Sequence, residues 1–134
     1  MTEAEKAKLK ILIIDDDNFL LNMYGNKFKN AGFDAEVASD TDIAFNKIKT
    51  GEIVPDVMLL DIIMPKMTGL ELVSKIKEEK LLPNVTYVML TNQSNSSDID
   101  KAKKLKVHGY IVKATTIPSE VVEEVTKIIE DNKK

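Results

Sequence analysis

Three consecutive aspartates directly follow four aliphatic residues in the stretch ILIIDDDNFL, residues 11–20. Carboxylates repel one another and an apolar segment solvates them poorly, so the cluster favours a nearby cation. Carboxylate and backbone oxygens suit Mg2+ better than a softer metal, because no His or Cys lies close in the sequence. The stretch therefore predicts a magnesium site that includes Asp15 and Asp16. The alternative is that the aspartates only cap a helix that begins near Asn18, because acidic residues favour helix N-termini.

Three further polar side chains each follow an apolar run. Asp61 follows DVMLL, Thr91 follows VTYVML, and Lys113 follows GYIV. Taken singly, Lys113 is one lysine among nineteen and Thr91 is an ordinary capping hydroxyl. Taken together, a metal, a carboxylate nucleophile, a hydroxyl and an ammonium group are what stabilises a phosphoryl group during transfer. The combination favours phosphoryl chemistry over four separate structural roles.

Apolar runs and segments with helical spacing alternate along the chain, and these elements must bring the polar residues together. The apolar runs are mostly continuous, which is typical of parallel strands covered on both faces. Segments with helical spacing separate them, such as the stripe Leu20, Tyr24, Phe28 and Ala31. Gly32 is expected to close that helix and Pro118 to open the last one. The predicted strands are residues 9–14, 33–38, 56–60, 85–90 and 109–112.

The repeated strand–helix alternation predicts an α/β fold with a doubly wound, five-stranded parallel sheet and helices on both faces. In such sheets, reactive groups gather beyond the carboxyl ends of the strands, where the strand order reverses. We expect one domain over residues 9–131, preceded by a lead segment over 1–8 and followed by a tail over 132–134.

Composition excludes several classes of function. The 134 residues include 43% hydrophobic and 31% charged residues, which is typical of a folded globular domain. All nineteen basic residues are lysine and the net charge is -3, which argues against direct nucleic-acid binding. Cysteine is absent, and apolar runs such as residues 11–14 are too short for membrane insertion. We therefore expect a cytoplasmic protein.

The motifs IIDDD, LLDIIMPKMTGLEL, VMLTN and GYIVK resemble those of the receiver domain of two-component response regulators, here of the single-domain type. The resemblance runs from about Leu9 to the end of the last helix, and it implies a flavodoxin-like sheet of strand order 2-1-3-4-5. It also implies that Asp61 accepts a phosphoryl group from a sensor histidine kinase or a phosphotransfer protein. Such a domain is not an enzyme, apart from catalysing its own phosphoryl transfer and slow dephosphorylation. Its downstream protein target is unknown.

The same resemblance assigns roles within the site. Asp16, Asp61 and the backbone carbonyl of Ile63 would ligate Mg2+, and Asp15 would act through a coordinated water. Lys113 and Thr91 would bind the phosphoryl oxygens. Asp17 matches no required position and is expected to start a helix.

The resemblance also implies a switch. Thr91 would be drawn toward the phosphoryl group and Tyr110 would fill the space that it leaves, although a statically packed Tyr110 is the alternative. The surface of the helix around residues 96–105, the strand at 109–112 and the last helix would change, and dimerisation through these helices stays open. Phe19 would contact the kinase if exposed, or pack in the core.

Several residues depart from the usual pattern. Ala114 replaces a proline whose peptide bond is cis in the family, and a cis bond before a non-proline costs about 3 kcal/mol. Either isomer stays open for Lys113–Ala114. Asn92 is bulkier than usual and is expected to slow phosphorylation by small donors. Ile63 and Gln93 occupy positions that tune dephosphorylation, and the aliphatic Ile63 predicts a long-lived phosphoryl state. Met64 and Met67 are expected to be apolar plugs, and His108 a loop residue.

Two other functions fit part of the sequence. A receiver-like docking module that is never phosphorylated would tolerate Ala114 and Asn92, although the complete set of polar residues argues against it. A haloacid-dehalogenase-type phosphatase would use Asp15 and Asp17. That class needs a second acidic pair on a later strand, and it leaves Asp61 unexplained.

Overall fold

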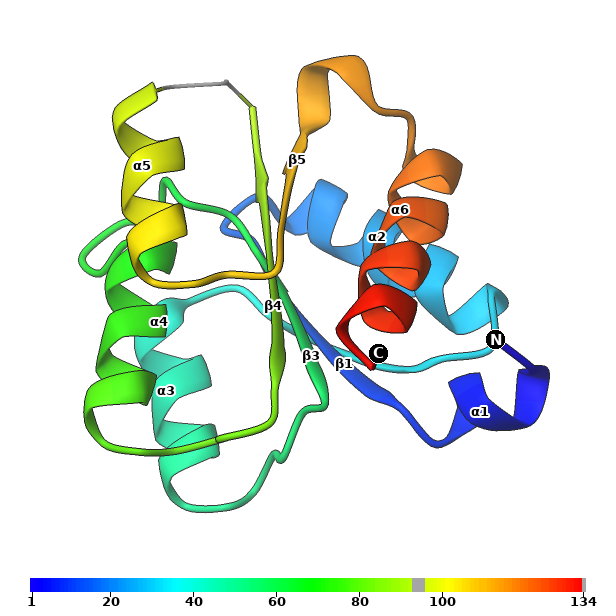
Figure 1. The fold of residues 1–134 in the computed structure, drawn as a ribbon, viewed down its shortest axis with the longest axis horizontal. Coiled ribbons are helices and arrows are strands. Elements are labelled where there is room, and N and C mark those ends of the chain that lie inside the picture. The colour runs from blue at the N-terminus through cyan, green and yellow to red at the C-terminus, as the bar shows by residue number, and fades with distance from the viewer. Residues whose placement is uncertain (93–95, 134) are drawn as a thin grey trace.

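A five-stranded parallel sheet forms the centre of the protein (Figure 1). The computed structural model describes residues 1–92 and 96–133. The strand order is β2-β1-β3-β4-β5, and every adjacent pair is parallel, so the predicted doubly wound fold is confirmed. The strands are β1 (Lys10–Ile14), β2 (Asp34–Ala38), β3 (Val57–Leu60), β4 (Thr86–Thr91) and β5 (Gly109–Val112).

Helices cover both faces of the sheet. In Figure 1, α2 (Asn18–Asn30) and α6 (Pro118–Asn132) lie on one face. On the other face lie α3 (Thr41–Lys49), α4 (Gly69–Glu78) and α5 (Ser96–Lys104). A single 3-10 turn, η1 (Lys113–Thr115), follows β5. Among the described residues, no helix is both long enough and apolar enough to cross a lipid bilayer.

The central strands separate two hydrophobic cores. Successive side chains of a strand point to opposite faces of the sheet. Leu12 and Ile14 of β1 accordingly pack under α3, α4 and α5, whereas Ile11 and Ile13 pack under α2 and α6. All four side chains are at most 1% exposed, which explains why the run is continuously apolar instead of alternating.

The helix α2 has the boundaries that its sequence predicts. Asp17 is its N-cap, because the side chain accepts a hydrogen bond from the Leu20 amide at 3.1 Å. At the other end, Gly32 adopts a φ of 104° and the Phe33 amide donates to the Phe28 carbonyl at 3.1 Å. The rings of Phe28 and Phe33 pack edge to face, with their centroids 5.7 Å apart. A glycine is favoured here because this left-handed conformation is unfavourable for a residue with a Cβ.

The first helix, α1 (Glu3–Ala7), lies in the segment that we expected only to lead into the domain. Thr2 and Glu5 form a capping box, in which each side chain accepts from the other residue's backbone amide. The amino group of Met1 pairs with Glu130 of α6 at 2.9 Å. The segment is therefore joined to α6 instead of running free.

His108 lies in the turn before β5, as the sequence predicts, and links this turn to β4. Its Nδ1 accepts a hydrogen bond from the Tyr87 amide at 3.0 Å, and its own amide donates to the Tyr87 carbonyl at 2.8 Å. Burial, with a smaller contribution from Lys77, lowers the pKa of His108. The neutral imidazole, with Nδ1 free to accept, is therefore the form that the fold favours.

This bond predicts a pH dependence of stability. Because the pKa of His108 is lower in the folded protein, the unfolded chain takes up the proton first as the pH falls. The stability that this hydrogen bond contributes is therefore complete at a pH above the pKa of His108 in the unfolded chain. It is lost as the pH falls through the pKa of His108 in the folded protein. We expect wild type to lose more free energy of unfolding than His108→Asn, whose Oδ1 accepts without titrating; because His108 is exposed, solvent limits the difference to about 0.5 kcal/mol or less.

Urea unfolding at about pH 7.5 and about pH 5.5 measures this difference, since histidine changes charge in that range. Equal losses in wild type and His108→Asn would contradict the assignment of Nδ1 as the acceptor.

Candidate functional site

Four polar residues from four strands meet at one edge of the sheet. Asp15 directly follows β1, Asp61 follows β3, Thr91 ends β4 and Lys113 follows β5. The backbone ladder continues one residue past the strands, because the Asp61 amide donates to the Ile14 carbonyl at 3.0 Å. The carboxyl ends of parallel strands share an edge, so side chains distant in sequence become neighbours.

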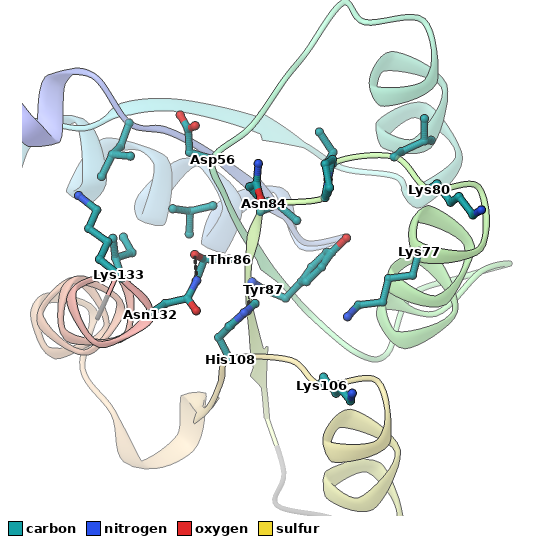
Figure 2. A pocket seen from close by; sticks show the side chains of 17 residues that line it. Asp56, Lys77, Lys80, Asn84, Thr86, Tyr87, Lys106, His108, Asn132 and Lys133 are labelled. Carbon is teal, nitrogen blue, oxygen red and sulfur yellow. Dashed lines mark hydrogen bonds between the residues drawn. The ribbon is translucent and has the colours of Figure 1, made fainter.

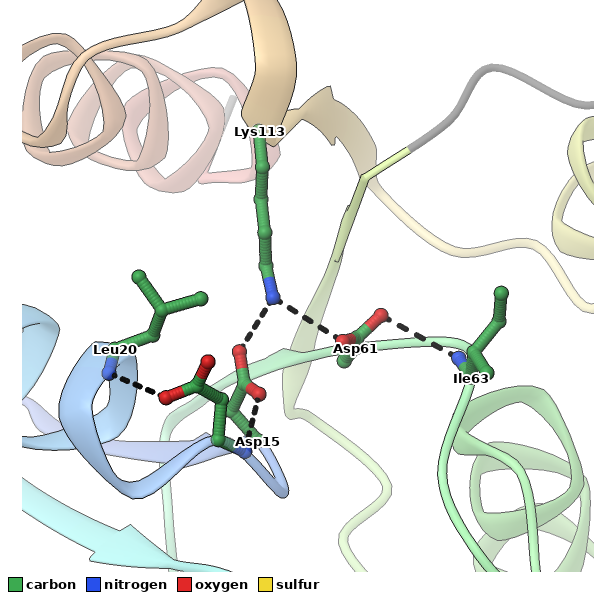
Figure 3. A network of polar contacts seen from close by, with 6 residues as sticks. Asp15, Leu20, Asp61, Ile63 and Lys113 are labelled. Carbon is green, nitrogen blue, oxygen red and sulfur yellow. Dashed lines mark hydrogen bonds and ion pairs between the residues drawn. The ribbon is translucent and has the colours of Figure 1, made fainter.

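The ammonium group of Lys113 lies between two buried carboxylates (Figure 3). Its Nζ is 2.5 Å from Oδ2 of Asp15 and 3.1 Å from Oδ2 of Asp61. Asp15 is 2% exposed and Asp61 is 6% exposed. The other oxygen of each carboxylate accepts a backbone N–H, from Asp17 at 3.0 Å and from Ile63 at 3.4 Å. All three buried charges therefore have partners, which offsets the cost of desolvating them.

Burial and charge oppose each other at this site. Burial raises the pKa of Asp61, and the neighbouring Lys113 offsets only part of that increase. Burial alone would lower the pKa of Lys113, but the hydrogen bond from Lys113 to Asp15 and the negative charge of Asp61 raise it. Lys113 is therefore held in its charged form beside a carboxylate that is easier to protonate than usual.

The acidic residues form a group whose chemistry fits a divalent cation. Oxygen atoms of Asp15, Asp16 and Asp61 all lie within 4.8 Å of one another, and Asp16 is exposed whereas the other two are buried. Three carboxylates and one ammonium leave a net charge of 1 - 3 = -2. An all-oxygen donor set with this charge suits Mg2+, which prefers carboxylate and water ligands. These residues therefore fit the predicted metal.

Asp17 differs from the two aspartates before it. Its Oδ1 is bound to the Leu20 amide at the start of α2, so it is the helix cap that we expected. In the phosphatase alternative Asp17 would act as the acid–base residue, and this capping contact does not favour that role.

Comparisons with known proteins agree with this arrangement. The family profile described as "Response regulator receiver domain" matches residues 11–126. Over 123 residues the chain is 31% identical to chemotaxis protein CheY-3 of Vibrio cholerae, covering 91% of this chain and 92% of that protein. The chain belongs to the response regulator receiver domain family. It is also 29% identical to the alkaline phosphatase synthesis transcriptional regulatory protein PhoP of Bacillus subtilis, covering 90% of this chain but 48% of PhoP.

Solved structures share the fold. CheY4 of Vibrio cholerae superposes with a TM-score of 0.80 at 25% identity, covering 90% of this chain and 98% of that one. A CheY-like receiver domain of Methanospirillum hungatei JF-1 superposes with a TM-score of 0.82 at 23% identity, covering 93% and 96% of the two chains. The domain is thus a signalling domain of the two-component type, and neither the docking-module nor the phosphatase alternative is favoured.

The other predicted site residues differ in how far they are exposed. Thr91 is 2% exposed and Asn92 follows it as an exposed residue. Ile63 is 65% exposed, and Tyr110 is partly buried against the core under α3 to α5. Gln93 lies outside the described residues.

Four further expectations concern residues around the site. The described residues contain no cis peptide bond, so Lys113–Ala114 is trans. Phe19 is 77% exposed and is therefore not a core residue. Met64 is buried and Met67 is packed against the same core, in keeping with their expected apolar role.

Two residues that support the loop after Asp61 were missed in the sequence. Thr41 is 1% exposed and its hydroxyl donates to the Met67 carbonyl at 2.8 Å. Gly69 lies against Asp61 so closely that a Cβ at position 69 would be 1.9 Å from the Asp61 carbonyl oxygen. The motif TG signals a helix start, but the close backbone approach is visible only in three dimensions.

Gly69→Ala is therefore expected to displace the backbone of Asp61. We expect a loss of about 3 kcal/mol in the free energy of unfolding, at the upper end of the usual cost of overpacking. Gly51→Ala is the control, since nothing lies within 4 Å of a Cβ there and only its φ of 81° is unfavourable. Chemical denaturation measures both variants. A Gly69→Ala protein no less stable than Gly51→Ala would contradict the close approach.

Proposed function

We propose that Asp61 is the phosphoacceptor of this receiver domain and that a histidine kinase or phosphotransfer protein is the donor. The observation that carries the proposal is the position of its carboxylate. One oxygen faces the Lys113 ammonium, the other accepts from the Ile63 amide, and acidic residues of the candidate metal group surround it. A nucleophile set among groups that stabilise phosphoryl oxygens is what the transfer requires.

In the proposed reaction, a carboxylate oxygen of Asp61 attacks the phosphorus of a phosphohistidine on the partner. The oxygen–phosphorus bond forms as the phosphorus–nitrogen bond breaks. The electron pair of the broken bond stays on the imidazole nitrogen. The product is an aspartyl phosphate that carries about 1.5 to 2 negative charges. Lys113 remains beside these oxygens and balances part of the added charge. The domain catalyses this step and its slow hydrolysis, but it turns over no external substrate.

Mg2+ is the proposed cofactor. Asp16 and Asp61 would ligate it together with the Ile63 carbonyl, and Asp15 would act through a coordinated water. When bound, the cation would neutralise the remaining acidic charge and stabilise phosphoryl oxygens. The fit of the donor set supports this assignment.

We propose that the signal leaves through the surface of α5, β5 and α6. Thr91 would donate its hydroxyl to the phosphoryl group, and Tyr110 would move toward the space that Thr91 vacates. Tyr110 lies on β5, opposite Met89 of β4, and its side chain is partly buried against the same core as Met89. An unidentified protein target would bind there, and association of two copies through α5 and α6 is compatible with the same surface.

Other features extend the proposal. Phe19, at the start of α2, is exposed and would contact the donor protein. Ile63 carries an aliphatic side chain that cannot orient an attacking water, so we propose a long-lived phosphoryl state, with Gln93 as a second tuning position. We also propose that the domain acts in the cytoplasm, which suits a chain without cysteine.

Phosphorylation of Asp61 is tested by intact-protein mass spectrometry after incubation with Mg2+ and a small phosphodonor. Wild type is expected to gain the mass of one phosphoryl group, and Asp61→Ala is expected to gain none. Asp17→Asn is the matched control, since this carboxylate caps α2 and should leave labelling intact. Labelling of Asp61→Ala to the wild-type level would refute the proposal. It would also be refuted if Asp17→Asn lost labelling while Asp61→Ala kept it.

Asn92 provides a test of access to the site. It is exposed directly beyond the buried Thr91, where a bulky side chain narrows the approach of a small donor. We expect Asn92→Ala to accelerate labelling by acetyl phosphate several-fold, measured as the initial rate. Asn26→Ala, an exposed position on α2, should leave the rate unchanged. Unaltered labelling of Asn92→Ala would count against gating.

A further inference from the structure

A second pocket lies at the opposite edge of the sheet from Asp61, where β3 and β4 begin (Figure 2). Its volume is about 930 Å3, within the range of about 300–1,000 Å3 that is usual for small-molecule sites. Its walls come from the first residues of β3 and β4, the segment 80–85, the turn before β5 and the last turn of α6. The proposed phosphoacceptor function uses none of these residues.

The lining of this pocket is strongly positive on a chain that is negative overall. It holds four lysines and one acidic residue, a sum of 4 - 1 = +3, whereas the whole chain carries -3. The acidic residue, Asp56, already accepts a hydrogen bond from the Lys10 amide at 2.9 Å. The four lysines, which form no ion pair within 4.0 Å with any residue that the structure describes, are Lys77, Lys80, Lys106 and Lys133.

Helix dipoles explain only part of this charge. Helices of a doubly wound fold end at this edge, and lysines in their last turns offset the partial negative charge of the carbonyls. All four pocket lysines are exposed, and the same role is equally open to an exposed lysine outside the pocket, such as Lys29 in the last turn of α2. Lys77 instead extends toward Tyr87 and His108 in Figure 2, and its Nζ lies 5.5 Å from the Tyr87 ring centroid. Lys80, Lys106 and Lys133 also line the pocket.

The wall around Tyr87 has unmet hydrogen-bonding capacity and a planar surface. The Tyr87 hydroxyl is buried and has no hydrogen-bond partner among the described residues. Leaving such a group unpaired is unfavourable, and a ligand atom or a bound water that reached it would satisfy it. The His108 ring lies nearly parallel to that of Tyr87, with centroids 6.4 Å apart and an interplanar angle of 12°, and His108 is exposed. Leu82, in the segment that lines the pocket, has an unfavourable φ of 48° for a leucine.

We propose that this pocket binds a small phosphorylated ligand of about nucleotide size. Its phosphate pairs with Lys77, and its planar body packs against His108 and the apolar segment 81–83. Lysine ammonium groups bind phosphate as point charges. The chain contains no arginine, so contacts with phosphate would be made by these point charges and not by a bidentate fork.

The test is an NMR titration of the full chain, labelled with 15N, in the absence of metal so that nucleotide carries no cation to Asp61. The probes are adenosine monophosphate, adenosine and inorganic phosphate. We expect adenosine monophosphate to shift the amide resonances of Tyr87, Lys106 and His108 saturably. Adenosine and inorganic phosphate should each bind more weakly than adenosine monophosphate. The amides of Asp16 and Asp61 should stay unchanged.

Lys77→Gln should weaken binding of adenosine monophosphate by about fivefold or more, the loss expected for one charge-assisted contact that is partly exposed. Lys29→Gln is the matched control, because it removes a lysine from the last turn of a helix outside the pocket. Equal losses in the two variants would reduce the effect to general charge attraction and overturn the proposal. So would the absence of saturable shifts at millimolar nucleotide, or inorganic phosphate that binds as tightly as the nucleotide.

Discussion

The ammonium group of Lys113 holds the acidic edge of the sheet together. It contacts Asp15 at 2.5 Å and Asp61 at 3.1 Å, and both carboxylates are buried. Removing Lys113 would leave two buried carboxylates without a compensating charge, which is strongly destabilising. Because the three residues follow β1, β3 and β5, their pairing also ties together strands that are not all adjacent. The chemistry of the site and the integrity of this edge therefore depend on the same contacts.

Much of this edge could be predicted from the sequence, for reasons visible in particular residues. The continuous apolar runs before Asp15, Asp61 and Lys113 identify buried parallel strands, and parallel strands bring the residues that follow them to one edge. Asp17 could be separated from its neighbours because it matches no required position of the receiver pattern, which left the start of a helix as its expected role. These predictions rest on the periodicity of apolar residues and on the positions of the polar residues that follow them, both of which can be read from the sequence.

Other features depend on distances that no pattern of residues displays. The contact of Lys113 with Asp15, closer than its contact with Asp61, follows from the path of one long side chain across the edge. The approach of Gly69 to the Asp61 carbonyl depends on how the loop turns back on the strand. The capping box at Thr2 was present in the sequence as a threonine followed three residues later by glutamate, but a helix as short as α1 has little periodicity to support it.

The burial of Lys113 also separates it chemically from the other amines of the chain. Every strongly basic side chain here is a lysine, so reagents that acylate amines encounter one functional group throughout. Most of the described lysines are exposed, whereas the side chain of Lys113 is 6% exposed and engaged by two carboxylates. Lys113 can be acylated only when this edge of the sheet opens. The rate of modification at this single position therefore reports how often that opening occurs.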